Sequence, residues 1–349
     1  MSNTKAYAAY NSKDPLAPYS FDRREVRPAD VQVEILYCGV CHSDIHQVRD
    51  EWDGSTYPMV PGHEIVGRVI KTGSEVKKFK VGDLAGVGVL VDSCRTCKSC
   101  MSGWENYCVE GMTGTYNDIE RDGVTVAQGG YSTQIVVDER YVLHISEKLD
   151  TASVAPLLCA GITTYSPLRY AKVERGMKVG VVGLGGLGHM GVKFAASFGA
   201  EVTMLSTSPE KEADAKRLGA HHFLLTTDKQ QMKKHESHFD VILNTISANH
   251  NYKPYLDLLD LKGKLLVVGL PSKHPETDPF ALIKNRRSIT GSMIGGMVET
   301  QEMLDYCAEK NIVADVEIIR MQEINEAYER MIKGDVRYRF VIDLASLKQ

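Results

Sequence analysis

The chain has 349 residues, enough for two domains, because a single hydrophobic core seldom grows beyond roughly 250 to 300 residues. Its 41 basic and 45 acidic residues leave a formal net charge of -4, which argues against binding to nucleic acid or to an anionic membrane. The amino-terminal stretch lacks the apolar core of a secretory signal, and the one Gly-rich apolar stretch, 177–199, is interrupted by Lys178 and Lys193. We therefore expect a soluble, cytoplasmic protein.

The first 155 residues or so show short apolar strands broken by Gly and Pro. This pattern predicts a β-rich domain. The expected strands lie within residues 31–40, 62–73, 81–90 and 131–145.

From Met177 onwards, apolar strands alternate with amphipathic helices. Such alternation predicts a parallel sheet with helices on both faces. The expected strands are 178–183, 201–206, 239–245 and 264–271, and the expected helices between them are 187–199, 209–220 and 252–263. The tail predicts two more helices, 300–310 and 324–334, and a last strand, 338–344.

Four cysteines, Cys94, Cys97, Cys100 and Cys108, lie close together in the first half of the chain. Their spacing lets short turns bring four sulfurs to one point, as a tetrahedral zinc site requires. Disulfides are rare in cytosolic proteins, so disulfide bonding is the weaker alternative. An iron-sulfur cluster would need a further cysteine near a proline or a second set of cysteines elsewhere, and the sequence has neither. The cluster predicts a structural zinc site, whose closed coordination braces a loop and catalyses nothing.

The sequence GLGGLG at 183–188 fits the pattern G-x-G-x-x-G. It follows a predicted strand and opens a predicted helix, where the glycines permit a tight turn and close approach of a pyrophosphate. The residues concerned are Gly183, Leu184, Gly185, Gly186, Leu187 and Gly188. We expect dinucleotide binding here; the alternative is an ordinary Gly-rich turn.

The end of the next strand indicates which dinucleotide binds. An acidic residue there would accept hydrogen bonds from the adenosine ribose. This chain instead has Ser206, Thr207 and Ser208, followed by Lys211. Hydroxyl donors and an ammonium suit the extra phosphate of NADP(H), although the hydroxyls could also cap the following helix.

A second candidate metal site involves Cys41, His63 and Glu64 at predicted strand ends. With Cys159, the chain offers two thiolates and one imidazole, the ligand set of a catalytic zinc that keeps one position open. The spacing alone does not prove that Cys159 joins Cys41 and His63.

Several motifs in order along the chain resemble the zinc-dependent medium-chain alcohol dehydrogenases, and among them the cinnamyl alcohol dehydrogenase group of NADP-dependent aldehyde reductases. They are GVCHSDIH, YPMVPGHE, CRTCKSC with Cys108, PLLCAGITTYSPL, VGLGGLGHMG, ITGSMIGG and DVRYRFV. The resemblance implies an α/β protein in which a Rossmann doubly wound parallel sheet, 159–295, is inserted into a β-rich GroES-like catalytic domain formed by 1–158 and 296–349. It also implies a homodimer.

The same resemblance implies roles for individual residues. Cys41, His63 and Cys159 would be the catalytic zinc ligands, with Glu64 able to approach the metal and Asp44 accepting a hydrogen bond from the zinc histidine. Ser43 and His46 match the proton relay, and His42 a position near the cofactor phosphates. The four clustered cysteines match the ligands of the structural zinc. The positions beside the nicotinamide are matched by Thr163, Thr245, Gly269, Ser292, Met293 and Ile294.

The implied reaction is a reversible hydride transfer between NADPH and an aldehyde that gives a primary alcohol, aromatic, cinnamyl-type or medium aliphatic. Gly114 and Met293 stand where plant members carry bulkier aromatic residues, so we expect a wider pocket. The alternatives are an NAD-dependent polyol or secondary-alcohol dehydrogenase and, more remotely, a cofactor-binding homologue without enzymatic activity.

Overall fold

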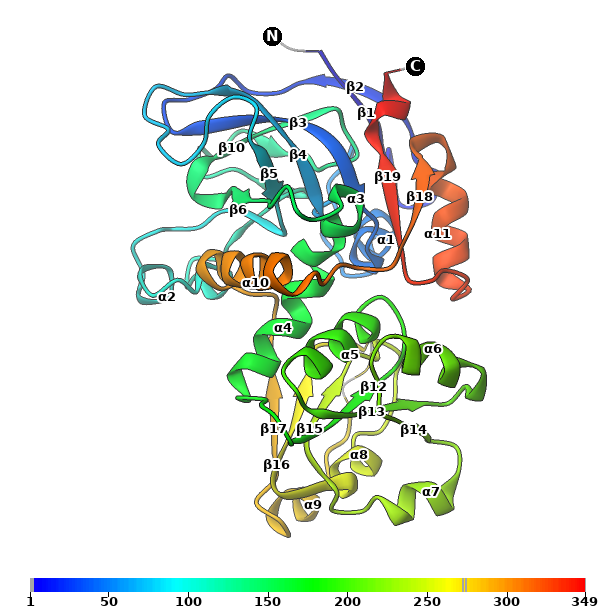
Figure 1. Ribbon diagram of the computed structural model, residues 1–349. Coiled ribbons are helices and arrows are strands. Elements are labelled where there is room, and N and C mark those ends of the chain that lie inside the picture. Colours follow the sequence, from blue (N-terminus) through cyan, green and yellow to red (C-terminus); the bar gives the residue numbers. More distant parts are fainter. Residues whose placement is uncertain (1–2, 272, 274, 349) are drawn as a thin grey trace. The chain divides into compact units, whose positions relative to one another are not determined.

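The computed structural model describes residues 3–271, 273 and 275–348 (Figure 1). The chain divides into two compact units: unit 1 comprises Met1–Ile162 and Gly295–Gln349, and unit 2 comprises Thr163–Ile294. The division expected from the sequence, at 158/159 and 295/296, differs by four residues at the first boundary and by one at the second.

Unit 1 is built around a seven-stranded sheet in the order β11-β5-β4-β3-β19-β18, with β10 also paired to β3. Strand β19 comes from the tail and pairs antiparallel with β3, so the two separate segments of unit 1 share one sheet. The strands are β3 (Asp30–Gly39), β4 (Ile65–Thr72), β5 (Leu84–Val87), β10 (Gln134–Asp138), β11 (Leu143–His144), β18 (Val316–Arg320) and β19 (Arg339–Asp343).

Three two-stranded sheets and several helices complete unit 1. The pairs are β1 (Asn3–Ala8) with β2 (Ala17–Asp22), β6 (Leu90–Asp92) with β7 (Thr113–Gly114), and β8 (Asp118–Ile119) with β9 (Val126–Ala127). The helices are α1 (His42–Val48), α2 (Lys98–Met101), α3 (Thr151–Val154), α10 (Met297–Lys310) and α11 (Ile324–Ile332). Helix α11 buries Ile324, Ala327, Tyr328 and Met331, the spacing of one apolar helix face. Helix α4 (Ala160–Tyr170) crosses the boundary between the units.

Unit 2 is a six-stranded parallel sheet in the order β14-β13-β12-β15-β16-β17. Counted within the unit this order is 3-2-1-4-5-6, the doubly wound arrangement of dinucleotide-binding folds. The strands are β12 (Lys178–Val182), β13 (Glu201–Ser206), β14 (His222–Leu225), β15 (Phe239–Asn244), β16 (Leu259–Val267) and β17 (Ser288–Gly291). The helices are α5 (Gly188–Ser197), α6 (Glu212–Arg217), α7 (Lys229–Lys234), α8 (Lys253–Leu258) and α9 (Pro279–Ile283).

The predicted helix 252–263 is wrong in its second half. Helix α8 ends at Leu258, and β16 begins at the next residue, where Leu259 is paired with Phe239 of β15. Both side chains are fully buried. Pairing with a buried strand therefore outweighs the helical spacing of the leucines.

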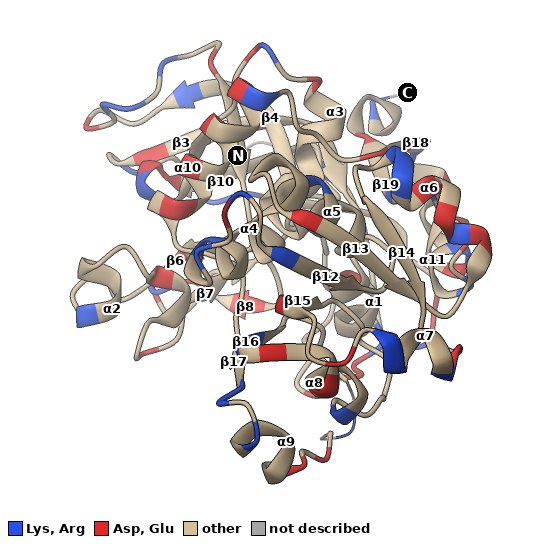
Figure 2. Cartoon of the chain, turned by 60° about the horizontal axis from the view of Figure 1, so that its bottom comes forward, with Lys and Arg blue, Asp and Glu red and all other residues tan. Residues whose placement is uncertain are grey.

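Charged residues of both signs are interspersed over the chain (Figure 2). Helix α6, for example, carries two acidic residues in its first turn and two basic residues in its last. Within the described residues, no helix combines the length and the apolar character needed to cross a membrane.

Candidate functional site

One candidate metal site lies entirely within unit 1. Cys41 precedes helix α1, His63 and Glu64 precede β4, and Cys159 follows the turn 155–158 before α4. Their ligand atoms all lie within 4.8 Å of one another, and all four side chains are buried. The structure thus brings Cys159 to Cys41 and His63, which the sequence spacing alone could not establish.

Asp44 orients the imidazole of His63. Its carboxylate lies 3.1 Å from His63 Nδ1 and accepts hydrogen bonds from the backbone N–H of Cys41 and Gly62 and from the Tyr131 hydroxyl. Burial lowers the pKa of His63, but the Asp44 carboxylate and the Cys41 sulfur outweigh it and raise the pKa well above its usual value. With Nδ1 facing Asp44, Nε2 is left to bind a metal.

Glu64 forms a buried ion pair with Arg339 of β19. Burial raises the pKa of Glu64 to about 7, although the guanidinium acts in the opposite direction. The second carboxylate oxygen, Oε2, is buried and has no hydrogen-bond partner among the described residues. A buried oxygen without a partner, next to two thiols and an imidazole, suits a site that binds a cation.

The two thiols of this site also fit a metal. Their sulfurs lie 3.9 Å apart. A hydrogen bond from Cys159 holds the pKa of Cys41 well below its usual value, whereas the same contact raises the pKa of Cys159. Ionisation of one thiol thus disfavours ionisation of the other, whereas a bound dication would stabilise both thiolates.

The four clustered cysteines form a second group in unit 1, and their ligand atoms also lie within 4.8 Å of one another. Cys97 and Cys100 sulfurs are 3.4 Å apart, and Cys94 and Cys100 sulfurs 3.9 Å. Backbone N–H groups of Cys94, Cys97 and Cys100 donate to the sulfurs of other cysteines in the cluster. All eight cysteines of the chain are free thiols, so the cluster is not disulfide-bonded and suits a closed four-thiolate zinc site.

Helix α1 carries the predicted proton relay. Ser43 Oγ lies 3.6 Å from Cys41 Sγ. His46 is partly exposed, its Nδ1 contacts the Glu51 carboxylate, and its ring lies 4.9 Å from the Trp52 ring. His42 lies on the same helix with its ring centroid 6.3 Å from that of His46, and burial lowers its pKa.

The predicted Gly-rich turn of unit 2 lies between β12 and α5. Gly183 has a φ of +88°, and a Cβ at Gly188 would come within 1.8 Å of the Gly183 oxygen, so both positions require glycine. A Cβ at Gly185 would meet no described atom within 4 Å. The turn is therefore tight on one side and open on the other, as a pyrophosphate beside a helix amino terminus requires.

The predicted residues after β13 lie next to this turn. Lys211 Nζ donates to the Leu184 oxygen over 3.2 Å. Ser206 is buried and its hydroxyl accepts a hydrogen bond from the backbone of Ser208, while Thr207 is exposed. Ser208 makes no side-chain cap to the turn Pro209–Lys211. The Lys211 ammonium thus stands directly at the Gly-rich turn.

The residues predicted beside the nicotinamide lie at the carboxyl ends of the sheet strands or on α4. Thr245 follows β15, and its hydroxyl donates to the Val182 and Gly183 oxygens. Gly269 follows β16, 292–294 follow β17, and Thr163 lies on α4. In a doubly wound sheet this edge is where a dinucleotide binds.

The chain matches two protein families. Residues 27–147 match the alcohol dehydrogenase GroES-like domain, and residues 186–309 match the zinc-binding dehydrogenase family. Aldehyde reductase YahK of Escherichia coli is 56% identical over 345 residues, covering 98% of this chain and 99% of the relative. The chain belongs to the zinc-binding alcohol dehydrogenases.

Solved structures agree with this dehydrogenase fold. A cinnamyl alcohol dehydrogenase of Sorghum bicolor, SbCAD4, superposes with a TM-score of 0.96 at 46% identity, covering 99% of this chain and 98% of that chain. The cinnamyl alcohol dehydrogenase of Helicobacter pylori, solved in complex with NADP(H), gives a TM-score of 0.92 at 42% identity, with 98% of each chain covered. The predicted GroES-like and Rossmann fold is confirmed.

Sequence reasoning assigned no role to Arg339, Glu51 or Tyr131, which contact the candidate site residues Glu64, His46 and Asp44. Arg339 lies in the motif DVRYRFV, yet nothing in its spacing links it to Glu64. The hydrogen bond between Glu51 and His46 could have been sought, because the two residues are only five positions apart.

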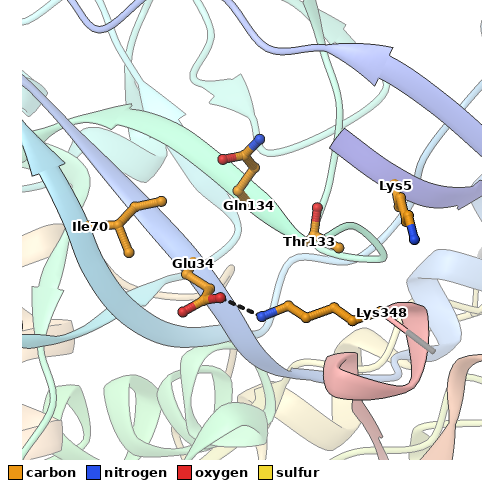
Figure 3. A pocket seen from close by; sticks show the side chains of 6 residues that line it. All are labelled: Lys5, Glu34, Ile70, Thr133, Gln134 and Lys348. Carbon is orange, nitrogen blue, oxygen red and sulfur yellow. Dashed lines mark hydrogen bonds and ion pairs between the residues drawn. The ribbon is translucent and has the colours of Figure 1, made fainter. Parts of the chain in front are cut away.

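A surface pocket of unit 1 lies apart from these residues (Figure 3). Its lining consists of Lys5, Glu34, Ile70, Thr133, Gln134 and Lys348. The Glu34 carboxylate is paired with the Lys348 ammonium. None of these six lining residues carries a thiol or an imidazole, so the pocket lacks the ligands of the candidate zinc site.

Proposed function

We propose that this dehydrogenase reduces an aldehyde to a primary alcohol with NADPH, using a zinc ion held by Cys41, His63 and Cys159. The observation that carries the proposal is the buried convergence of two thiols and an imidazole from three separate segments. The family and the NADP(H) complex of the Helicobacter pylori relative support it. The four clustered cysteines would hold a second, structural zinc.

A zinc ion bound at the first site supplies Lewis acidity that polarises the carbonyl oxygen of the aldehyde. The side chains around it prepare this chemistry. Asp44 fixes the tautomer of His63, and the Arg339 guanidinium offsets the charge of the buried Glu64 carboxylate.

The product oxygen needs a proton, and we assign the delivery of this proton to Ser43 and His46. Aldehyde, NADPH and one proton give alcohol and NADP+. Ser43 Oγ stands beside the buried thiol, whereas His46 is partly exposed and can exchange protons with solvent. The contact with Glu51 would orient the His46 ring during this transfer.

The preference for NADPH rests on Lys211 at the Gly-rich turn, together with the lack of a carboxylate at 206–208. We further propose that the substrate is aromatic, cinnamyl-type or medium aliphatic. The glycine at position 114, half-buried in β7, would leave room for it.

We also propose a cytoplasmic homodimer. Strand β17 is the last strand of the unit 2 sheet, and an edge strand can pair with that of a second copy. Analytical ultracentrifugation at micromolar concentration tests this; a monomer at all concentrations would contradict it.

The test is reduction of cinnamaldehyde and benzaldehyde with NADPH and NADH in parallel, with metal content measured on the same sample. We expect two zinc ions per chain and a clear preference for NADPH. In Lys211→Ala, kcat/KM for NADPH should fall roughly 10- to 100-fold, the worth of one charge-assisted hydrogen bond, while that for NADH stays nearly unchanged. Lys216→Ala, which removes an exposed lysine paired with Glu212, is the control. Equal use of both cofactors by the wild type would refute the NADPH preference.

A further inference from the structure

Arg23 directly follows strand β2 and donates hydrogen bonds to a loop more than 100 residues later in the chain. Its Nε donates to the Gln134 oxygen (3.0 Å), Nη1 to the Gln128 oxygen (2.6 Å), and Nη2 to the Gly129 oxygen and the Ser132 hydroxyl (2.9 Å each). All four acceptors are uncharged. The guanidinium therefore donates to three carbonyls and one hydroxyl of one backbone segment, residues 128–134, which we call the brace segment.

The brace segment in turn holds the loop 58–62, which leads into His63. Backbone N–H groups of Gly129, Gly130 and Tyr131 donate to the oxygens of Val60, Gly62 and Pro61 over 2.6, 2.8 and 2.9 Å. The approach is close, since a Cβ at Gly129 would lie 2.4 Å from the Pro61 oxygen. The Gln128 side chain adds bonds to the Val60 N–H (2.6 Å) and the Pro58 oxygen (3.1 Å).

The same segment reaches the partner of the metal-binding histidine. The Tyr131 hydroxyl donates to Asp44 Oδ2 over 3.2 Å, and the Gly62 N–H donates to Asp44 Oδ1 over 3.2 Å. Asp44 Oδ1 also contacts His63 Nδ1. Thus both the backbone before His63 and the carboxylate that orients its ring depend on the position of the brace segment.

We propose that Arg23 is a positioning residue for the metal-binding site: it fixes the brace segment, and through it the place and orientation of His63. The N–H groups of Gly129, Gly130 and Tyr131 donate to the loop before His63. The carbonyls of Gln128 and Gly129 accept from Arg23 instead. A planar guanidinium with five N–H groups can serve several carbonyls at once, whereas a lysine ammonium has three donors around a single atom. Without Arg23, the carbonyls of Gln128, Gly129 and Gln134 each lose a donor, and the segment relaxes.

The inference rests on the proposed metal-binding role of His63, and the experiment separates the two. Metal affinities of both sites are measured by competition with a chelator in wild type, Arg23→Lys and Arg24→Lys. Arg24 is the matched control because it is the next residue and pairs with carboxylates, those of Asp30 and Glu120. Thiolate-to-cobalt charge-transfer bands, whose intensity follows the number of thiolates, identify which site is filled.

In Arg23→Lys we expect the affinity of the Cys41, His63 and Cys159 site to fall roughly 10-fold, the lower end for residues that support metal ligands, with the four-cysteine site unchanged. Arg24→Lys should change neither affinity. Equal losses at both sites, or a lower melting temperature with an unchanged affinity of the first site, would overturn the proposal, because Arg23 would then act only on overall stability.

Ser132→Ala is a second variant in case Arg23→Lys does not fold. It removes only one acceptor of Arg23, and the Ser132 hydroxyl also donates to the Gly129 oxygen within the brace segment. We expect a smaller loss of affinity, about threefold, again at the first site alone. No loss there would count against the proposal. If the wild type fills only the four-cysteine site, the proposed function fails instead.

Discussion

The two thiol clusters of unit 1 differ in how far apart their ligands lie in the sequence. One gathers Cys94, Cys97, Cys100 and Cys108 from a single loop, with backbone N–H groups donating to the sulfurs. The other joins Cys41 to Cys159 across 118 positions, with His63 from a third segment. The first depends on short turns, and the second depends on the whole sheet that places its three segments.

The surroundings of the two clusters differ as well. Around the four cysteines the groups that contact the sulfurs are backbone amides, the Ser93 and Thr96 hydroxyls and a partly exposed guanidinium, that of Arg121, 4.0 Å from the Cys108 sulfur. Around the other cluster, three charged side chains are buried: Asp44, Glu64 and Arg339. We infer that the first cluster contributes to stability and the second to chemistry, so substitutions should separate the two effects.

The largest expected effect is the loss of activity in Cys41→Ser. Without this thiolate the Lewis acid is lost, which removes several kcal/mol of transition-state stabilisation and lowers kcat about a thousandfold. NADPH should still bind, because the Gly-rich turn belongs to unit 2. Steady-state kinetics, cofactor fluorescence and metal analysis check this, with Cys307→Ala, a buried thiol outside both clusters, as control. Loss of NADPH binding would contradict the assignment of Cys41.

The next effect should be on stability, in Arg339→Met. The substitution leaves the Glu64 carboxylate buried without its ion-pair partner, which typically costs about 3–5 kcal/mol of unfolding free energy. Adding Glu64→Gln should recover much of this loss, since no charge is then stranded. Denaturant unfolding of the single and double variants measures both. A single variant as stable as the wild type would show that the pair contributes no net stability.

Cys100→Ser should have a smaller effect on stability and little effect on chemistry. A structural zinc contributes directly to folding, but the loop that carries this cluster can open locally. We expect a loss of about 2 kcal/mol, a fall in melting temperature of roughly 4–8 °C, with kcat below that temperature within about twofold of the wild type. An inactive but fully stable variant would reverse the roles assigned to the two clusters.

The difference between the clusters also explains what the sequence could predict. The four-cysteine cluster and the Gly-rich turn are encoded by local spacing, so their residues were found directly. The other ligand set could be completed with Cys159 only through family resemblance, because pairing of distant strands brings it together. Arg339 was missed for the same reason: β19 reaches β3 from the far end of the chain.

Local patterns also misled at the end of α8. The leucines of 252–263 have helical spacing, but residues from Leu259 onwards join the parallel sheet. A sheet partner that lies elsewhere in the sequence cannot be read from the spacing of the segment itself.

The smallest expected effect is that of Ser93→Ala, which tests a buried hydroxyl beside the four cysteines. The Ser93 hydroxyl accepts from the Cys100 thiol (3.1 Å) and lies 2.7 Å from the Tyr141 hydroxyl, fully buried. Its removal should cost about 1 kcal/mol of unfolding free energy, because the Tyr141 hydroxyl loses a buried partner. In a protein that already carries Tyr141→Phe, Ser93→Ala should cost less unfolding free energy. A double-mutant cycle measures this coupling between Ser93 and Tyr141. A change in kcat with Ser93→Ala would mean that the two clusters are coupled, contrary to the separation argued above.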